Sequence, residues 1–211
     1  MSGRGSFDQS YFEGKLGVYE GGYYTRANIV RHFYRGVLRK FRLKGGKNKK
    51  ALDVGCAYGY GVEILAEQGY DAYGCDVSEY AVRTANTLHN WSRCFVLNVE
   101  KETLPLHFFD LVTLINTIEH FKDPESVINN VKKSLKRCGV VLVATNNPWS
   151  PLNLRDRDPT HQSVFSPIKW YSIFRKYFKN VYVATYITSK SLNLLHIPFF
   201  GYVTLLKATI S

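Results

Sequence analysis

Short apolar runs alternate with segments of helical periodicity from about residue 51 onward. Five of these runs have the length and composition of buried strands, at 51–54, 71–75, 94–98, 110–115 and 139–145. Strands that alternate with helices are typical of a parallel sheet with crossover helices, so the pattern predicts an α/β fold. Two later β-rich runs, at 181–188 and about 199–209, bring the expected number of strands to seven.

The helical segments carry their own start and stop signals. Helices are expected at 59–68, 78–88, 123–138 and 167–178. Ser78 and Asp123 are good N-caps, and a proline follows Asp123 at the first helical position. Gly69 and Gly139 stand where the first and third helices should stop. A long polar loop at 146–167 precedes the last helix, and loops of this length in a compact domain are usually functional.

The first fifty residues contain a further amphipathic helix, expected at about 26–43. Apolar side chains recur along one side of it, and Arg31, Arg35 and Arg39 follow the other side. Residues 1–50 carry a net charge of +9 out of +11 for the whole chain. This helix either packs on the domain with a solvated basic face or presents that face to an anionic partner.

Length and composition favour one domain. The chain has 211 residues, of which 45% are hydrophobic and 21% charged, as in soluble globular proteins. We expect a single domain with a basic, aromatic N-terminal cap (1–50), a core (51–150) and a closing region of loop, helix and strands (151–211). Four widely spaced cysteines without a C-x-x-C pair argue against a zinc site.

The sequence has no secretory signal and no run long enough to span a membrane, so we expect a cytoplasmic protein. The segment Ser191–Leu206 has no Lys, Arg, Asp or Glu. We interpret it as a buried strand pair that closes the sheet, with an interfacial membrane anchor as the alternative.

A glycine-rich loop follows the first expected strand, in the stretch LDVGCAYGYG (52–61). Its glycines are spaced G-x-x-x-G-x-G, whereas a dinucleotide-binding loop needs G-x-G-x-x-G. No Gly-Lys-Ser/Thr follows, which excludes a P-loop. The remaining pattern is D-x-G-x-(G/A)-x-G, formed by Asp53, Gly55, Ala57 and Gly59.

This pattern resembles the first motif of the class I S-adenosylmethionine-dependent methyltransferases. In that family the loop passes beneath the amino-acid end of the cofactor. Asp76, at the end of the second expected strand, stands where a carboxylate accepts hydrogen bonds from both ribose hydroxyls. The loop and the acid together indicate S-adenosyl-L-methionine as the cofactor.

The segment 97–148 is similar to the small-molecule branch of that family, which includes ubiquinone-biosynthesis enzymes (methyltransferase type 11). The resemblance implies a Rossmann-like, seven-stranded, mostly parallel sheet with helices on both faces and an antiparallel last strand. It also implies that Asn98 and Val99 contact the adenine and that Asn116 lies near the methionine part. The expected cofactor-binding residues are Asp53, Gly55, Cys56, Ala57, Gly59, Asp76, Val77, Asn98, Val99 and Asn116.

Methyl transfer from a sulfonium depends mainly on alignment, and a base is needed only if the acceptor must lose a proton. The candidates for that base are Glu119 and His120, which follow the fourth expected strand, and their alternative role is structural. His161, in the long loop, is a candidate for substrate contact. Some quinone-type relatives bind a divalent cation through E-x-x-E-H, but Asn116 occupies the first position here, so we predict no metal.

Aromatic residues at Tyr19, Tyr23, Tyr24 and Trp149 either form a lid over the substrate or simply pack. We interpret the motif NNPW (146–149) as an ordinary loop sequence. The alternative is that it marks an enzyme that methylates amino groups. The predicted activity is methylation of oxygen or carbon in a small-molecule or lipid-linked acceptor. The alternatives are an RNA methyltransferase guided by the basic helix and a cofactor-binding but inactive partner subunit.

Overall fold

The computed structural model describes residues 7–15, 17–153, 158–188 and 194–210. The chain divides into two compact units. The first consists of residues 1–98 and 157–160, and the second of residues 99–156 and 161–211.

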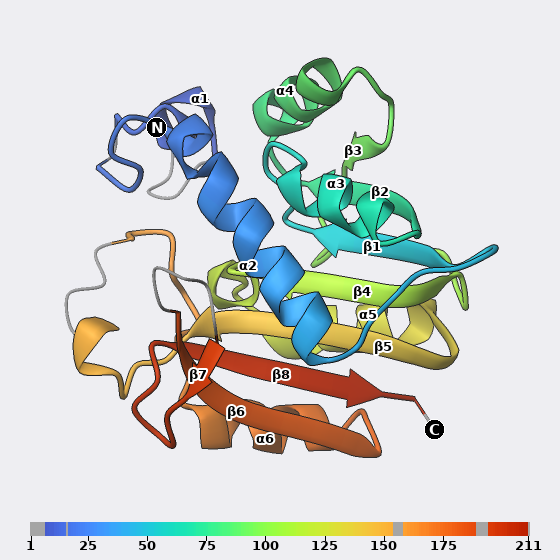
Figure 1. The fold of residues 1–211 in the computed structure, drawn as a ribbon, viewed down its shortest axis with the longest axis vertical. Coiled ribbons are helices and arrows are strands. Elements are labelled where there is room, and N and C mark those ends of the chain that lie inside the picture. Colours follow the sequence, from blue (N-terminus) through green and yellow to red (C-terminus); the bar gives the residue numbers. More distant parts are fainter. Residues whose placement is uncertain (1–6, 16, 154–157, 189–193, 211) are drawn as a thin grey trace. The chain divides into compact units, whose positions relative to one another are not determined.

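Three parallel strands form the sheet of the first unit, in the order β3-β2-β1 (Figure 1). They are β1 (Lys50–Val54), β2 (Asp71–Asp76) and β3 (Cys94–Val96). Helix α3 (Tyr60–Glu67) packs on β1 and β2, and α4 (Glu79–His89) packs on β2 and β3. The predicted N-cap of α4 is confirmed, since the Ser78 hydroxyl accepts from the Ala81 N–H at 3.2 Å.

The N-terminal part of the first unit is helical. It contains α1 (Gln9–Phe12), the 3-10 helix η1 (Tyr23–Arg26) and α2 (Ala27–Lys40). Helix α2 packs against α3 and buries Tyr34, Val37 and Leu38, whereas Ile29 in its first turn is exposed. The long predicted helix is therefore confirmed, with its first turn replaced by η1 and its end at Lys40.

Five strands form the sheet of the second unit, in the order β4-β5-β8-β6-β7. They are β4 (Phe109–Ile115), β5 (Leu135–Asn146), β6 (Asn180–Thr188), β7 (Leu194–His196) and β8 (Val203–Thr209). Strands β4 and β5 are parallel, and β8 is antiparallel to β5 and to β6, as predicted for the last strand. Helix α5 (Pro124–Ser134) packs on β5, and α6 (Pro167–Arg175) packs on β6 and β8 (Figure 1). Two 3-10 turns complete this unit, η2 (Ile118–His120) and η3 (Pro151–Asn153).

Three details of the predicted elements are wrong. The described residues contain eight strands rather than seven, because β7 precedes β8, and the last run begins at Val203 instead of 199. The helix expected to stop at Gly139 ends at Ser134. Leu135 is fully buried, adopts an extended backbone with ψ of 138° and pairs with Phe109, so the strand begins before the predicted helix end.

The expectation that 191–206 is a buried strand pair is also only partly right. Residues 191–193 lie outside the described residues. Val203, Leu205 and Leu206 are buried in β8, but Leu195 and Phe199 are mostly exposed. Within the described ranges, the helices are all too short or too polar to cross a membrane.

Candidate functional site

The glycine-rich loop connects β1 to α3 and runs through three left-handed residues. Gly55, Ala57 and Gly59 have φ of 73°, 46° and 77°. The N–H groups of Gly55 and Cys56 both donate to the carbonyl of Cys75, at 2.8 and 3.0 Å, which anchors the loop to the end of β2. The left-handed conformation suits the two glycines, but alanine pays a steric cost there.

Asp76, the last residue of β2, joins the loop to the start of α4. One carboxylate oxygen accepts from the Ala57 N–H and the other from the Ser78 N–H, each at 2.9 Å. The side chain is 8% exposed. Burial raises the pKa of Asp76, and the N–H groups of Ser78, Ala57 and Val77 oppose that rise. Because a carboxylate can accept about four hydrogen bonds, Asp76 keeps acceptor capacity for a ligand.

A second buried carboxylate, Asp53, is held from the N-terminal helix. The Tyr34 hydroxyl of α2 donates to Asp53 Oδ1 at 2.7 Å, and both side chains are buried. Burial and the neighbouring Asp53 raise the pKa of Tyr34 well above its usual range. Gly61 leaves the room for this pair, since a Cβ there would lie 2.3 Å from Asp53 Oδ2. Sequence reasoning missed this role of Tyr34, whose only signal was its place on the apolar face of α2.

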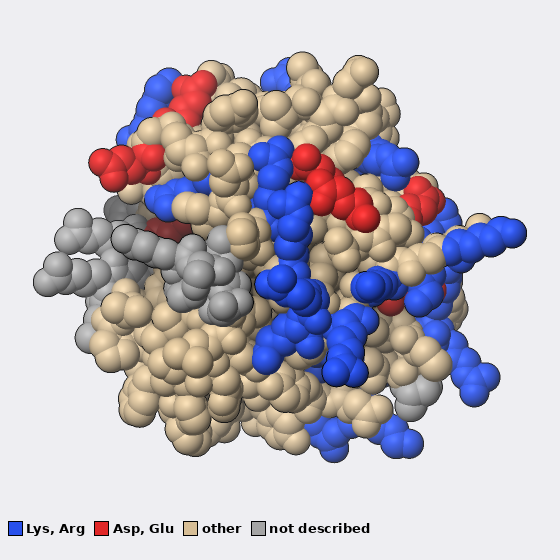
Figure 2. All heavy atoms as spheres, viewed as in Figure 1, with Lys and Arg blue, Asp and Glu red and all other residues tan. Residues whose placement is uncertain are grey.

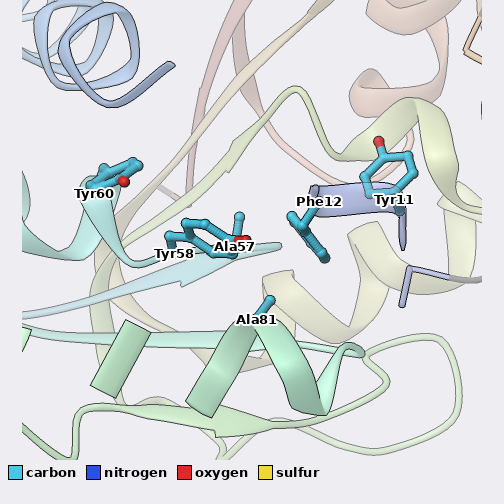
Figure 3. Close-up of a cluster of buried hydrophobic side chains, with 6 residues drawn as sticks. All are labelled: Tyr11, Phe12, Ala57, Tyr58, Tyr60 and Ala81. Atoms are coloured by element: carbon cyan, nitrogen blue, oxygen red, sulfur yellow. The ribbon is translucent and has the colours of Figure 1, made fainter. Parts of the chain in front are cut away.

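Aromatic side chains of the N-terminal segment pack directly on the loop (Figure 3). The Phe12 ring of α1 stacks on Tyr58 with centroids 5.4 Å apart. Ala81 of α4 belongs to the same buried cluster as Phe12 and Tyr58. The Tyr11 hydroxyl donates to Asp158 at 3.0 Å. The N-terminal segment therefore covers the loop, as a cap would.

The tyrosines predicted for a lid lie in the same region. Tyr19 and Tyr23 pack edge to face with centroids 4.9 Å apart, and both pack against the buried cluster of Figure 3. Tyr24 points into solvent and is 64% exposed. Packing thus accounts for Tyr19 and Tyr23, and a substrate role for Tyr19 and Tyr24 remains a prediction.

The other expected cofactor contacts are divided between the two units. Cys56 is buried in the loop of the first unit, Val77 is exposed after β2, and Asn98 is half-buried after β3. In the second unit Val99 is buried and Asn116 is exposed. Asn116 follows β4 with a left-handed φ of 50°, a conformation that asparagine tolerates, and its N–H donates to the carbonyl of Ala144 at 2.8 Å.

The candidate catalytic side chains of the second unit do come together. Ligand atoms of Glu119, His120 and His161 all lie within 4.8 Å of one another. Glu119 is buried and the two histidines are half-buried, with ring centroids 4.7 Å apart. The N–H groups of Gln162 and Ser163 donate to the Glu119 carbonyl, both at 2.8 Å, and so hold His161 beside η2. This imidazole and carboxylate cluster can accept a proton, and its donors also suit a divalent metal.

The NNPW motif has a structural role. Asn147 is fully buried, and its Nδ2 donates to the carbonyls of Phe199 and Gly201 at 2.8 Å each. Its Oδ1 accepts from the Trp149 N–H at 3.1 Å. Trp149 is 39% exposed and contacts the Phe199 ring.

Lys and Arg side chains form a stripe over α2 (Figure 2). Two of the three arginines considered for RNA binding are paired within the first unit. Arg31 contacts Glu63 at 2.7 Å and Arg35 contacts Glu67 at 2.8 Å, both glutamates being on α3. These ion pairs support the interpretation of α2 as a helix packed on the domain.

The fold and the loop define a class I S-adenosylmethionine-dependent methyltransferase domain with a Rossmann-like, mostly parallel sheet. A family model described as "Methyltransferase domain" matches residues 26–183. The chain belongs to this methyltransferase domain family.

Two curated relatives match about half of this chain. A "Ubiquinone biosynthesis O-methyltransferase" of Pectobacterium carotovorum is 34% identical over 112 residues, which cover 50% of this chain and 46% of the relative. One of the same name from Aliivibrio fischeri (strain MJ11) is 35% identical over 105 residues, covering 47% of this chain and 44% of the relative. The match thus spans about half the length of the curated relatives.

Solved structures share the fold. A SAM-dependent methyltransferase of Archaeoglobus fulgidus superimposes with a TM-score of 0.72 at 19% identity, covering 94% of this chain and 98% of that one. A phosphoethanolamine N-methyltransferase 2 of Haemonchus contortus, solved with S-adenosyl-L-methionine, gives a TM-score of 0.66 at 16% identity. That match covers 95% of this chain and 55% of the other.

Proposed function

We propose that this protein binds S-adenosyl-L-methionine and methylates a hydroxyl oxygen of a small or lipid-linked aromatic molecule. The observation that carries the proposal is the contact between Asp76 and Ala57, which joins the family's glycine loop to its acidic residue through one hydrogen bond. The names of the curated relatives support oxygen as the acceptor atom.

The residues present fit the cofactor. Asp76 retains lone pairs for the ribose hydroxyls, and the left-handed turns at Gly55 and Gly59 keep side chains off the loop. We propose that the binding residues are those expected from the sequence, with Tyr34 holding Asp53 in place. The aromatic cap over the loop would exclude water.

Bound S-adenosyl-L-methionine would supply an electrophilic methyl group on a positively charged sulfur, and breaking that carbon–sulfur bond would leave S-adenosylhomocysteine. We assign to His120 or His161 the acceptance of the hydroxyl proton as the new carbon–oxygen bond forms, and to Glu119 the orientation of the imidazoles. Glu119 and His120 follow the carboxyl end of β4, and ligands of open α/β sheets bind at carboxyl ends of strands. Imidazole is well suited to this step near neutral pH.

Transfer of a labelled methyl group to catechol-type acceptors, with and without a prenyl tail, tests the proposal. We expect an O-methyl product and a fall in kcat of about 10²-fold or more in His120→Gln or His161→Gln. Cofactor affinity should not change in these variants, and His107→Gln, a change outside the cluster, serves as the matched control. Transfer to nitrogen or to RNA would contradict the proposal. Loss of activity in EDTA would show that the cluster acts through a metal.

A further inference from the structure

An exposed apolar patch lies on the second unit, on β7 and on the loops that follow β5 and precede β8. Large apolar side chains are rarely exposed together on a soluble protein without a binding role. We define the patch as five side chains of these segments that are 39 to 66% exposed: Trp149, Leu152, Leu195, Phe199 and Phe200. The Trp149 and Phe199 rings contact each other, with centroids 6.4 Å apart.

Hydrogen bonds hold the two loops together beneath the patch. Besides the two bonds from buried Asn147 to the Phe199 and Gly201 carbonyls, Asn153 Nδ2 donates to the carbonyl of Tyr202 at 2.8 Å. The same Nδ2 donates to the Asn147 carbonyl at 2.9 Å. The apolar side chains of these two loops are therefore carried by backbone segments that hydrogen bonds join to each other.

The backbone at Phe199 is unfavourable for the residue that it carries. Its φ is 64°, in the left-handed region where a bulky residue is a clear outlier and glycine is at ease. Residues held in such a conformation cluster at functional positions. A large aromatic side chain is thus kept at a position where glycine would suit the fold better.

The distribution of charged residues in the second unit helps to identify the partner of the patch. The described segments 146–153 and 194–206 contain no Lys, Arg, Asp or Glu, and Figure 2 shows no charged side chain over β7 on the face in view. Protein interfaces instead carry a polar rim and are enriched in arginine. The second unit as a whole has thirteen Lys and Arg against seven Asp and Glu, a net charge of +6.

We propose that the apolar patch inserts into the surface of an anionic lipid bilayer. Trp, Phe and Leu side chains enter the boundary between headgroups and acyl chains, and the positive charge of the unit attracts anionic headgroups. The proposal deepens the proposed function, because it places the protein where a lipid-linked acceptor resides. The binding step itself needs neither cofactor nor acceptor.

Co-sedimentation of the full chain with vesicles of phosphatidylglycerol and phosphatidylcholine tests the proposal. We expect binding that Phe199→Gly weakens severalfold and that Phe199→Gly with Phe200→Ser weakens about tenfold or more. Since Phe199→Gly relieves the left-handed strain, its thermal stability should not fall, which separates lost binding from lost folding. Brominated lipids should quench Trp149 emission, measured as the difference between the wild type and Trp149→Tyr.

The matched control is Leu106→Ser, which removes a 66% exposed side chain beside the amino end of β4, away from the patch. It should bind vesicles as the wild type does. The proposal is overturned if the wild type does not sediment with anionic vesicles, or if the double variant sediments equally well. Self-association that the double variant abolishes, without vesicle binding, would assign the patch to a second copy instead. Methylation of a water-soluble acceptor should persist in the double variant, so this result stands apart from the proposed function.

Discussion

Replacing Asp76 by asparagine removes one charge and one acceptor from the centre of the proposed cofactor site. In the wild type both oxygens accept backbone N–H bonds at 2.9 Å, and each keeps acceptor capacity for the proposed ribose contact. Hydrogen bonds to a charged group contribute about 1.5–3 kcal/mol, so Asp76→Asn should weaken S-adenosylhomocysteine binding by about 10- to 150-fold. Isothermal titration calorimetry measures this directly.

The cost to folding should be smaller than the cost to binding. One of the Ala57 and Ser78 N–H groups loses its acceptor, at about 1–3 kcal/mol, but the buried charge and its desolvation penalty disappear too. Asp71→Asn, the same change at the opposite end of β2, is the control and should leave cofactor affinity unchanged. If Asp76→Asn binds the ligand as tightly as the wild type, the carboxylate does not accept hydrogen bonds from the ribose hydroxyls, and the proposed role of Asp76 is refuted.

The raised pKa of Asp76 gives the same substitution a pH signature. A carboxyl whose pKa is higher in the folded state than its ordinary value of 3.8 stabilises the protein most below that value. This contribution is lost as the pH rises through the raised pKa. Asp76→Asn should remove that part of the pH dependence of unfolding. In the wild type, ligand affinity should fall as the pH drops through the raised pKa, because the protonated carboxyl is a poorer acceptor.

Two further substitutions test the surroundings of the loop. Ala57→Gly relieves a left-handed alanine, which costs about 1–2 kcal/mol, and the greater chain entropy of glycine offsets part of that gain. Urea unfolding should therefore show up to about 1 kcal/mol of added stability, and a clear loss would mean that the alanine methyl is needed for packing. Tyr34→Phe removes the 2.7 Å bond to Asp53 and should lower the free energy of unfolding by about 1–3 kcal/mol, whereas an unchanged value would show that Asp53 does not depend on it.

Local signals predicted the parts of the site that are continuous in sequence. The strand β1, the glycine loop and the acid at the end of β2 follow one another along the chain. Ser78 marks the start of α4 because its hydroxyl can cap a helix. Glu119 and His120 were found because they follow a strand. Their contact with His161 depends on two N–H bonds to the Glu119 carbonyl, which no sequence pattern reveals.

Tertiary contacts explain what the patterns could not predict. The helix α5 ends early because Leu135 pairs with Phe109 across the sheet, and that pairing outweighs the helix-stopping signal of Gly139. The sequence of 191–206 shows that this run is hydrophobic. It does not show which of its side chains the protein buries and which stay exposed. Asn147 donates a hydrogen bond to the carbonyl of Phe199 and so helps to hold the backbone there. The two residues are distant in sequence, so no local pattern predicts this contact.

The contacts of the N-terminal helix α2 with the loop motif explain its place in the fold better than its positive charge does. Tyr34 reaches from its inner face to Asp53 of the loop motif, and Arg31 and Arg35 pair with α3 through Glu63 and Glu67. Ion pairs that solvent reaches contribute little energy, and these two are part-buried and exposed, so the buried hydroxyl-to-carboxylate bond is the stronger link between α2 and the loop. A basic stripe therefore does not by itself indicate a nucleic-acid substrate here. Part of it is the outer side of a helix whose inner side holds Asp53 of the loop motif.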